Sequence, residues 1–211
     1  MLRSQLMAMC VMQNKLNSII NPDWIEAGYP WHRAIFVEAG ELMEHYGWKW
    51  WKAQTPDVAQ VQLELVDIWH FILSDTIQRT RSIDEAATLL GYIWHTPTQA
   101  MYGHPADTRR MIEMFAAMTV TSRVPAVDLF RGLCASVGLS ETGLYQKYVA
   151  KNVLNLFRQA HGYKDGSYIK VWRGHEDNEW LNSLMEKSPE ATPEQLTAEL
   201  EKMYAQVVGA A

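Results

Sequence analysis

Two pairs of acidic residues stand three positions apart in otherwise apolar segments. Glu38 and Glu41 form one pair, and Glu64 and Asp67 form the other. Residues at this spacing share one face of a helix, so each segment would present two carboxylates together. Carboxylate oxygens are the ligands that Mg²⁺ and Mn²⁺ prefer, whereas zinc prefers nitrogen and sulfur. Four such groups on two helices would suit Mg²⁺, with Mn²⁺ as the alternative ion.

The surroundings of these acids, rather than their spacing, favour a metal site. Acidic pairs at this spacing occur elsewhere in the chain. The segment 58–77, however, carries only three ionised residues, which are Glu64, Asp67 and Asp75. They fall on one narrow stripe of a helix that is apolar almost all round, and such a helix is buried. Buried carboxylates must be protonated, paired with Arg or Lys, or bound to cations. Because the stripes contain no Arg or Lys, bound metal ions are a better explanation of the buried acids than Arg–Glu networks are.

These acids must be positioned by helices, because the hydrophobic periodicity is helical nearly everywhere and no segment alternates like a strand. We expect an all-α bundle of six to eight helices with the four-carboxylate site in its core. The predicted helices span about residues 2–20, 30–46, 56–80, one or two segments within 81–125, 126–137, 142–159 and 193–207. Thr55 is the predicted cap of the third helix, with Pro56 in its first turn, and residues 161–178 are predicted to be loop.

The domain organisation follows from the same pattern. Residues 1–187 are predicted to form a single domain, within which 81–125 is the least readable part. One or two helices are expected there around Gly91 and Gly103, with breaks at Pro97, Pro105 and Pro125. Residues 188–211 are predicted to contain a final amphipathic helix, because Thr192 and Gln195 form a capping box around Pro193.

A basic segment near the end of the chain could hold phosphates. Residues 147–173 contain six basic residues and one acid, in a chain of net charge −5. Lys151, Asn155 and Arg158 form one polar stripe of a helix. Cations on a helix and an adjoining glycine-containing loop suit a polyphosphate, although a solvated basic face explains them equally well.

Two further groups of side chains could recognise a base. Gln13 and Asn17 lie one helical turn apart, and their amides offer both donors and acceptors. Trp48, Trp50 and Trp51 lie with two lysines in the loop after Glu44, where an exposed ring could stack on a base. A simpler interpretation is that the two amides face solvent and that the tryptophans are part of the core.

Composition narrows the class of protein. With 211 residues, 48% of them hydrophobic, the chain can bury a full core and is not disordered. Its acidity argues against general binding of nucleic acid or anionic membrane. Cys10 and Cys134 lack metal-binding spacing, which suits a reducing compartment. Without an export signal or a long apolar segment, we expect a cytoplasmic protein that binds neither nucleic acid nor membrane.

Taken in order, these motifs resemble the dimeric, all-α dUTPases. The stretches that carry the resemblance are Gln13-x-x-x-Asn17, Glu38-Ala-Gly-Glu41 through Lys52, Glu64 through Phe71, and Lys151 through Asn178. The likeness spans about residues 10–180, with 81–145 matching poorly. Paired acids alone indicate only a superfamily of nucleotide pyrophosphohydrolases, and the block from Lys151 onward is the specific part.

The resemblance implies a role for each group. Glu38, Glu41, Glu64 and Asp67 would hold Mg²⁺ against the phosphates, and either Glu38 or Glu41 would be the catalytic general base. Gln13 and Asn17 would read uracil, Trp50 would flank it, and His70 and Phe71 would line the deoxyribose. The phosphates would be bound by Lys151, Asn155, Arg158, Tyr163, Lys164, Lys170 and Asn178. The implied protein is a homodimeric dUTP diphosphatase that yields dUMP and pyrophosphate and also accepts dUDP.

Three other functions remain open from the sequence. A related all-α pyrophosphohydrolase would share the acids but prefer another base, such as that of dCTP. A non-enzymatic nucleotide or nucleic-acid binder would use the Trp and Lys loop without hydrolysis. A di-iron carboxylate protein would need Glu-x-x-His on two helices, and only Asp67 with His70 approaches that pattern.

Overall fold

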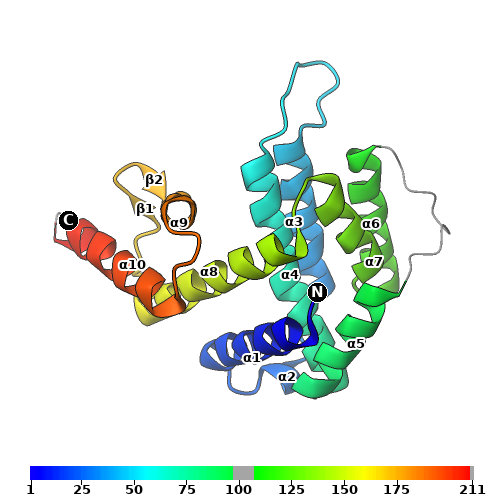
Figure 1. Ribbon diagram of the computed structural model, residues 1–211, viewed down its shortest axis with the longest axis horizontal. Helices are drawn as coiled ribbons and strands as arrows, with labels where there is room; N and C mark the ends of the chain where they lie inside the picture. Colours follow the sequence, from blue (N-terminus) through cyan, green and yellow to red (C-terminus); the bar gives the residue numbers. More distant parts are fainter. Residues whose placement is uncertain (97–106, 210–211) are drawn as a thin grey trace.

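Helices dominate the computed structural model, which describes residues 1–96 and 107–209 (Figure 1). Within those residues there are ten helices and one short hairpin of two strands. The elements are α1 (Arg3–Ile20), α2 (Trp24–Ala27), α3 (Trp31–Tyr46), α4 (Val58–Thr80), α5 (Ile83–His95), α6 (Thr108–Ser122), α7 (Val127–Ser136), α8 (Glu141–Ala160), β1 (Val171–Trp172), β2 (His175–Glu176), α9 (Asp177–Lys187) and α10 (Pro193–Val208).

The predicted all-α class is confirmed, but six to eight helices is too few. The sequence interpretation misses α2, which is only four residues long, and α9, which begins inside the predicted loop. It also misses the hairpin of β1 and β2, which pair antiparallel. The turn between them has positive φ at both Arg173 and Gly174, as a two-residue hairpin turn requires. The expected breaks at Pro97 and Pro105 lie outside the described residues, whereas the break at Pro125 is confirmed, because Pro125 lies between α6 and α7.

Helix α4 is the centre of the main bundle. Its side chains are buried on nearly every face, and they pack against α1, α3, α5, α7 and α8. It begins at Val58 rather than at Pro56, and its cap is Asp57, whose carboxylate accepts a hydrogen bond from the Gln60 amide at 3.2 Å. The predicted cap at Thr55 is therefore wrong. An Asp at this position accepts a hydrogen bond from a free backbone amide, and its negative charge is attracted to the positive end of the helix dipole.

Helices α3 and α4 form a long antiparallel pair. The Trp31 indole nitrogen, at the start of α3, donates to the Gln78 side chain near the end of α4 at 2.9 Å. At the opposite end, His45 Nε2 lies 3.5 Å from Glu64 Oε1. The two acidic pairs therefore lie along the stretch over which α3 and α4 run side by side.

Helix α8 connects the main bundle to the C-terminal elements, as Figure 1 shows. Its first half contributes Leu144 and Tyr148 to the main hydrophobic core. Its second half contributes Leu154 and Phe157 to a second core. That second core is completed by buried side chains of the hairpin, α9 and α10, namely Trp172, Leu181, Leu196, Leu200 and Tyr204. The polar stripe of Lys151, Asn155 and Arg158 consequently lies on the half of α8 that packs in the second core.

The capping box that was predicted before α10 is present. The Thr192 hydroxyl accepts from the Gln195 amide at 3.3 Å, and the Gln195 side chain accepts from the Thr192 amide at 2.9 Å. None of the helices in the described part of the chain has the length and apolar character of a membrane span.

Candidate active site

Three of the four predicted metal-binding carboxylates converge. Glu38 and Glu41 on α3 and Glu64 on α4 each have an oxygen within 4.8 Å of the others. Glu64 is buried, Glu38 is half-buried and Glu41 is exposed. The cluster therefore lies in the contact between the two helices and is open to solvent on one side. The expectation that both helices bury their acids completely is not met at Glu41.

The fourth acid, Asp67, has a different partner. Its Oδ2 accepts a hydrogen bond from Lys151 Nζ at 2.9 Å, and the Lys151 side chain is only 4% exposed. Asp67 is not among the carboxylates that share the 4.8 Å cluster. The predicted four-carboxylate site is thus a three-glutamate cluster with an adjacent ion pair. The pairing of Lys151 with Asp67 was not predicted, because Lys151 lies on α8 and not on the helix that carries the acids.

The cluster is electrostatically unfavourable without a cation. Burial, and after it the negative charges of Asp67, Glu64 and Glu41, together raise the pKa of Glu38 to about 8. Burial and the charge of Asp67 likewise raise the pKa of Glu64 to about 7. Carboxylates that are held this close are stabilised as anions when a cation joins them. A site with only oxygen donors fits a hard divalent ion such as Mg²⁺ or Mn²⁺.

A cleft of about 690 Å³ opens beside the cluster. Its walls come from α1, α3, α4, α8 and the segments next to them. The lining residues are Gln13, Leu16, Asn17, Ile20, Trp24, Tyr29, Pro30, Trp31, Arg33, Ala34, Asp67, His70, Phe71, Asn155, Arg158, Gln159 and Tyr163. Ala34 precedes Glu38 by one helical turn, and Asp67 follows Glu64 by less than one turn. The cleft therefore ends where the carboxylates begin.

The amide pair lies in this cleft. Gln13 and Asn17 are both buried, and Gln13 Nε2 donates to Asn17 Oδ1 at 2.9 Å. His70 lies on the same wall, with Nδ1 2.7 Å from Gln13 Oε1. Phe71 forms the next part of the wall and stacks on Trp31, with 6.1 Å between ring centroids and 27° between ring planes. The structure brings these four residues together along one cleft, and their roles stay a prediction.

The basic stripe of α8 is already paired within the protein. Arg158 donates to both carboxylate oxygens of Asp177, at 2.8 and 2.6 Å. Asn178 accepts from Lys151 at 3.0 Å and from Arg158 at 3.4 Å. Tyr163 lies over the Arg158 guanidinium, 5.7 Å from it. Asn155 and Arg158 still line the cleft, so the stripe does face the predicted site.

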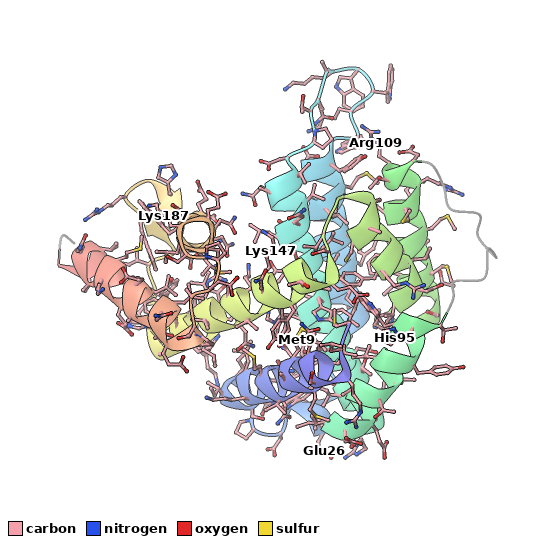
Figure 2. The ribbon with its side chains drawn as sticks, viewed as in Figure 1. Met9, Glu26, His95, Arg109, Lys147 and Lys187 are labelled. Atoms are coloured by element: carbon pink, nitrogen blue, oxygen red, sulfur yellow. The ribbon has the colours of Figure 1, made fainter. Side chains whose placement is uncertain are left out.

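The remaining predicted site residues lie outside the cleft lining. Lys164 donates to the Ile20 carbonyl at 3.0 Å, and Lys170 pairs with Glu176 at 2.8 Å on the surface. Trp50 is 90% exposed. It belongs to the loop that connects α3 to α4 and projects away from the bundle in Figure 1. The side chains of this loop extend into the surroundings in Figure 2.

Several cleft residues were missed from the sequence. Trp24, Tyr29 and Trp31 form an aromatic wall just before and at the start of α3. Their close spacing is a signal that could have identified them. Arg33, near the start of α3, also lines the cleft.

The sequence of the chain was compared with protein families and with curated proteins. A family model described as dUTPase covers residues 5–163, well over half of the chain. The matched range contains the amide pair, all four predicted acids and the stripe of α8, whereas Lys164, Lys170 and Asn178 lie beyond it. None of the curated proteins that were compared matches the chain. The chain belongs to the all-α dUTPase family, whose members hydrolyse dUTP.

Proposed function

We propose that this chain converts dUTP, and also dUDP, to dUMP in a reaction that depends on Mg²⁺ or Mn²⁺. The observation that carries the proposal is the convergence of Glu38, Glu41 and Glu64 within 4.8 Å, at the end of a cleft of about 690 Å³. Family membership supplies the substrate, and the oxygen-only donor set supplies the choice of ion.

The three glutamates would hold the ions, with Asp67 joining them when Lys151 exchanges its partner for a phosphate. When bound, a divalent cation offsets the charge of the phosphate oxygens and acidifies water. Glu38 or Glu41 would take the proton from the attacking water. Both are on α3, and Glu41 is the more exposed.

The rest of the cleft would hold the nucleoside. We propose that Gln13 and Asn17 read uracil and that His70 and Phe71 contact the deoxyribose, because all four line the cleft. Trp50 would flank the base, and its exposed ring is free to stack on a ligand.

The phosphates would be bound by residues of α8 and the segment after it. The proposed residues are Lys151, Asn155, Arg158, Tyr163, Lys164, Lys170 and Asn178. Three of them, Asn155, Arg158 and Tyr163, line the cleft, which supports the assignment. Lys151 and Arg158 would divide their hydrogen-bond donors between a phosphate and the acids that now accept from them.

The assembly and location of the protein are part of the same proposal. We propose a homodimer on the basis of family membership, and light scattering after size-exclusion chromatography would measure it. The two free, buried cysteines support a reducing compartment such as the cytoplasm. Residues 1–187 are proposed to be one domain, and residues 188–211 to add the C-terminal amphipathic helix α10, which packs on α8.

Pyrophosphate release tests the proposal. The assay measures turnover of dUTP, dCTP, dTTP and dATP, each with and without Mg²⁺. We expect hydrolysis of dUTP that requires the ion, and we expect Glu64→Gln to lower kcat/KM for dUTP at least about 100-fold, because the substitution removes a charged ligand. Glu44→Gln is the matched control, since Glu44 lies on α3 but pairs with Lys49 instead of joining the cluster. Equal turnover of dUTP and dCTP, or full activity of Glu64→Gln, would contradict the proposal.

A further inference from the structure

A chain of side-chain hydrogen bonds runs behind the amide pair and connects α1, α4 and α8. Ser74 Oγ donates to the His70 carbonyl at 2.9 Å and accepts from Asn17 Nδ2 at 2.9 Å. Asn17 Oδ1 accepts from Gln13 Nε2 at 2.9 Å. Gln13 Oε1 lies 2.7 Å from His70 Nδ1 and 3.0 Å from the Tyr148 hydroxyl. The Tyr148 hydroxyl shares its single hydrogen between Gln13 Oε1 and the carbonyl of Met9 on α1, which is also 3.0 Å away, and it accepts from Asn152 Nδ2 at 3.5 Å. Met9 is labelled in Figure 2.

The direction of this chain follows from its fixed end. A backbone carbonyl only accepts, so the Ser74 hydrogen is used on the His70 carbonyl, and Ser74 Oγ is left to accept from the Asn17 amide nitrogen. Asn17 must then turn its oxygen toward Gln13, and Gln13 must turn its own oxygen toward His70. His70 Nδ1 consequently carries the hydrogen.

His70 fits this direction. It is buried, and burial lowers its pKa to about 3, so the ring is neutral. Its Nε2 is a buried polar atom without a hydrogen-bond partner in the described part of the chain. With the hydrogen on Nδ1, Nε2 is a bare acceptor on a residue that lines the cleft. A ligand that donates to Nε2 would give this buried nitrogen the hydrogen-bond partner that it lacks.

We infer that Ser74 and Tyr148 are positioning residues that hold the Asn17 and Gln13 amides in one orientation and thereby decide which pyrimidine the cleft accepts. The inference rests on the proposed reading of the base by Gln13 and Asn17. Neither Ser74 nor Tyr148 is among the residues that line the cleft, so neither touches the base itself. Each acts through an amide that does line it.

The specificity arises because uracil and cytosine present opposite edges. Uracil has an acceptor oxygen at C4 and a donor N–H at N3, whereas cytosine has a donor amino group and a bare acceptor nitrogen. Asn17 retains one free N–H and one free oxygen lone pair after its two internal hydrogen bonds. An Asn amide that could rotate would match either base by exchanging these two groups. The hydrogen-bond chain prevents the rotation, because a reversed Asn17 would direct its NH₂ group at that of Gln13.

The test compares dUTP with dCTP in variants that remove one anchor each. Ser74→Ala deletes the acceptor for Asn17, and Tyr148→Phe deletes the hydroxyl beside Gln13 while keeping the ring that packs on His70. We expect the ratio of kcat/KM for dUTP to that for dCTP to fall at least about tenfold in each variant, a typical value for one mismatched pair of hydrogen bonds. The change should come from KM, with kcat for saturating dUTP retained within about threefold.

Two substitutions that remove similar groups elsewhere are the matched controls. Thr76→Val deletes a buried hydroxyl of α4 that bonds the Ile72 carbonyl in the same way, outside the cleft. Tyr145→Phe deletes a hydroxyl on α8 three residues from Tyr148. Both should keep the parental ratio, and melting temperatures verify that all variants fold.

Calorimetric binding of dUMP and dCMP tests the inference without hydrolysis. We expect the parent to prefer dUMP and both anchor variants to lose about tenfold of that preference. A parent that binds dUMP selectively but hydrolyses no nucleotide would contradict the proposed function alone. The inference is overturned if the ratio stays within about twofold of the parent in both anchor variants, or if the parent itself binds the two monophosphates equally.

Discussion

Substitution of Arg158 should destabilise the fold in addition to weakening phosphate binding. Asp177 is completely buried, and both of its carboxylate oxygens accept from Arg158, at 2.8 and 2.6 Å. The Tyr168 hydroxyl also donates to Asp177 Oδ2, at 2.7 Å. Arg158→Met keeps much of the aliphatic packing but leaves a buried carboxylate without its cation, which costs about 3–5 kcal/mol. With an m value of about 2 kcal/mol per molar urea, the unfolding midpoint should fall by about 2 M.

The pH dependence of this loss identifies its cause. Burial by itself raises the pKa of Asp177, but the hydrogen bonds and charge of Arg158 outweigh burial, so the net shift is downward. In Arg158→Met the pKa of Asp177 should lie above its ordinary value. The folded state then binds more protons than the unfolded chain, so the variant should lose stability as pH rises from about 4 toward neutrality.

Two controls make the result decisive. Arg173→Met removes an exposed arginine that bonds Gln206 at the surface, and it should change stability by less than about 0.5 kcal/mol. Asp177→Asn, added to Arg158→Met, should recover a large part of the loss, because it removes the unpaired charge. If Arg158→Met costs less than about 1 kcal/mol, or if the double variant is no more stable than the single one, Arg158 does not stabilise the contact between α8 and α9 in this way.

Two further predictions concern the carboxylates and the exposed tryptophan. Without divalent ions, the pKa is about 8 for Glu38 and about 7 for Glu64, against an ordinary value of 4.5. Between pH 5 and 8 the folded state therefore binds more protons than the unfolded chain, so Tm should fall as the pH rises through this range. Mg²⁺ should make the fall in Tm smaller, and Glu38→Gln should make Tm less dependent on pH. A Tm that rises between pH 5 and 8 would contradict this prediction. Trp50→Ala should leave unfolding unchanged, because the ring is 90% exposed, yet raise KM for dUTP at least about fivefold by loss of stacking, and an unchanged KM rejects the stacking role.

The sequence by itself determined the helices that carry the carboxylates. Leu, Ile and Val recur around the whole circumference of 58–80, so this helix has to be central, and its few acids have to lie at a contact. The spacing of Glu38 and Glu41 placed them on one face of the preceding helix. Gln13 and Asn17 share one face of α1 because a four-residue separation on a helix is close to one turn, whereas their place in the cleft depends on how α1 packs. These features depend on residues that are close together in the sequence, so they can be predicted from it.

The partners of the charges were decided only by the tertiary structure. Asp67 is paired with Lys151, which is 84 positions away in sequence, and Arg158 is paired with Asp177 across the turn into α9. The sequence shows that such acids need a cation, but not whether a metal or a distant base supplies it. Which of the two lies within reach depends on how α8 crosses α4. That crossing results from the packing of many apolar side chains in two cores, and no local pattern of residues encodes it.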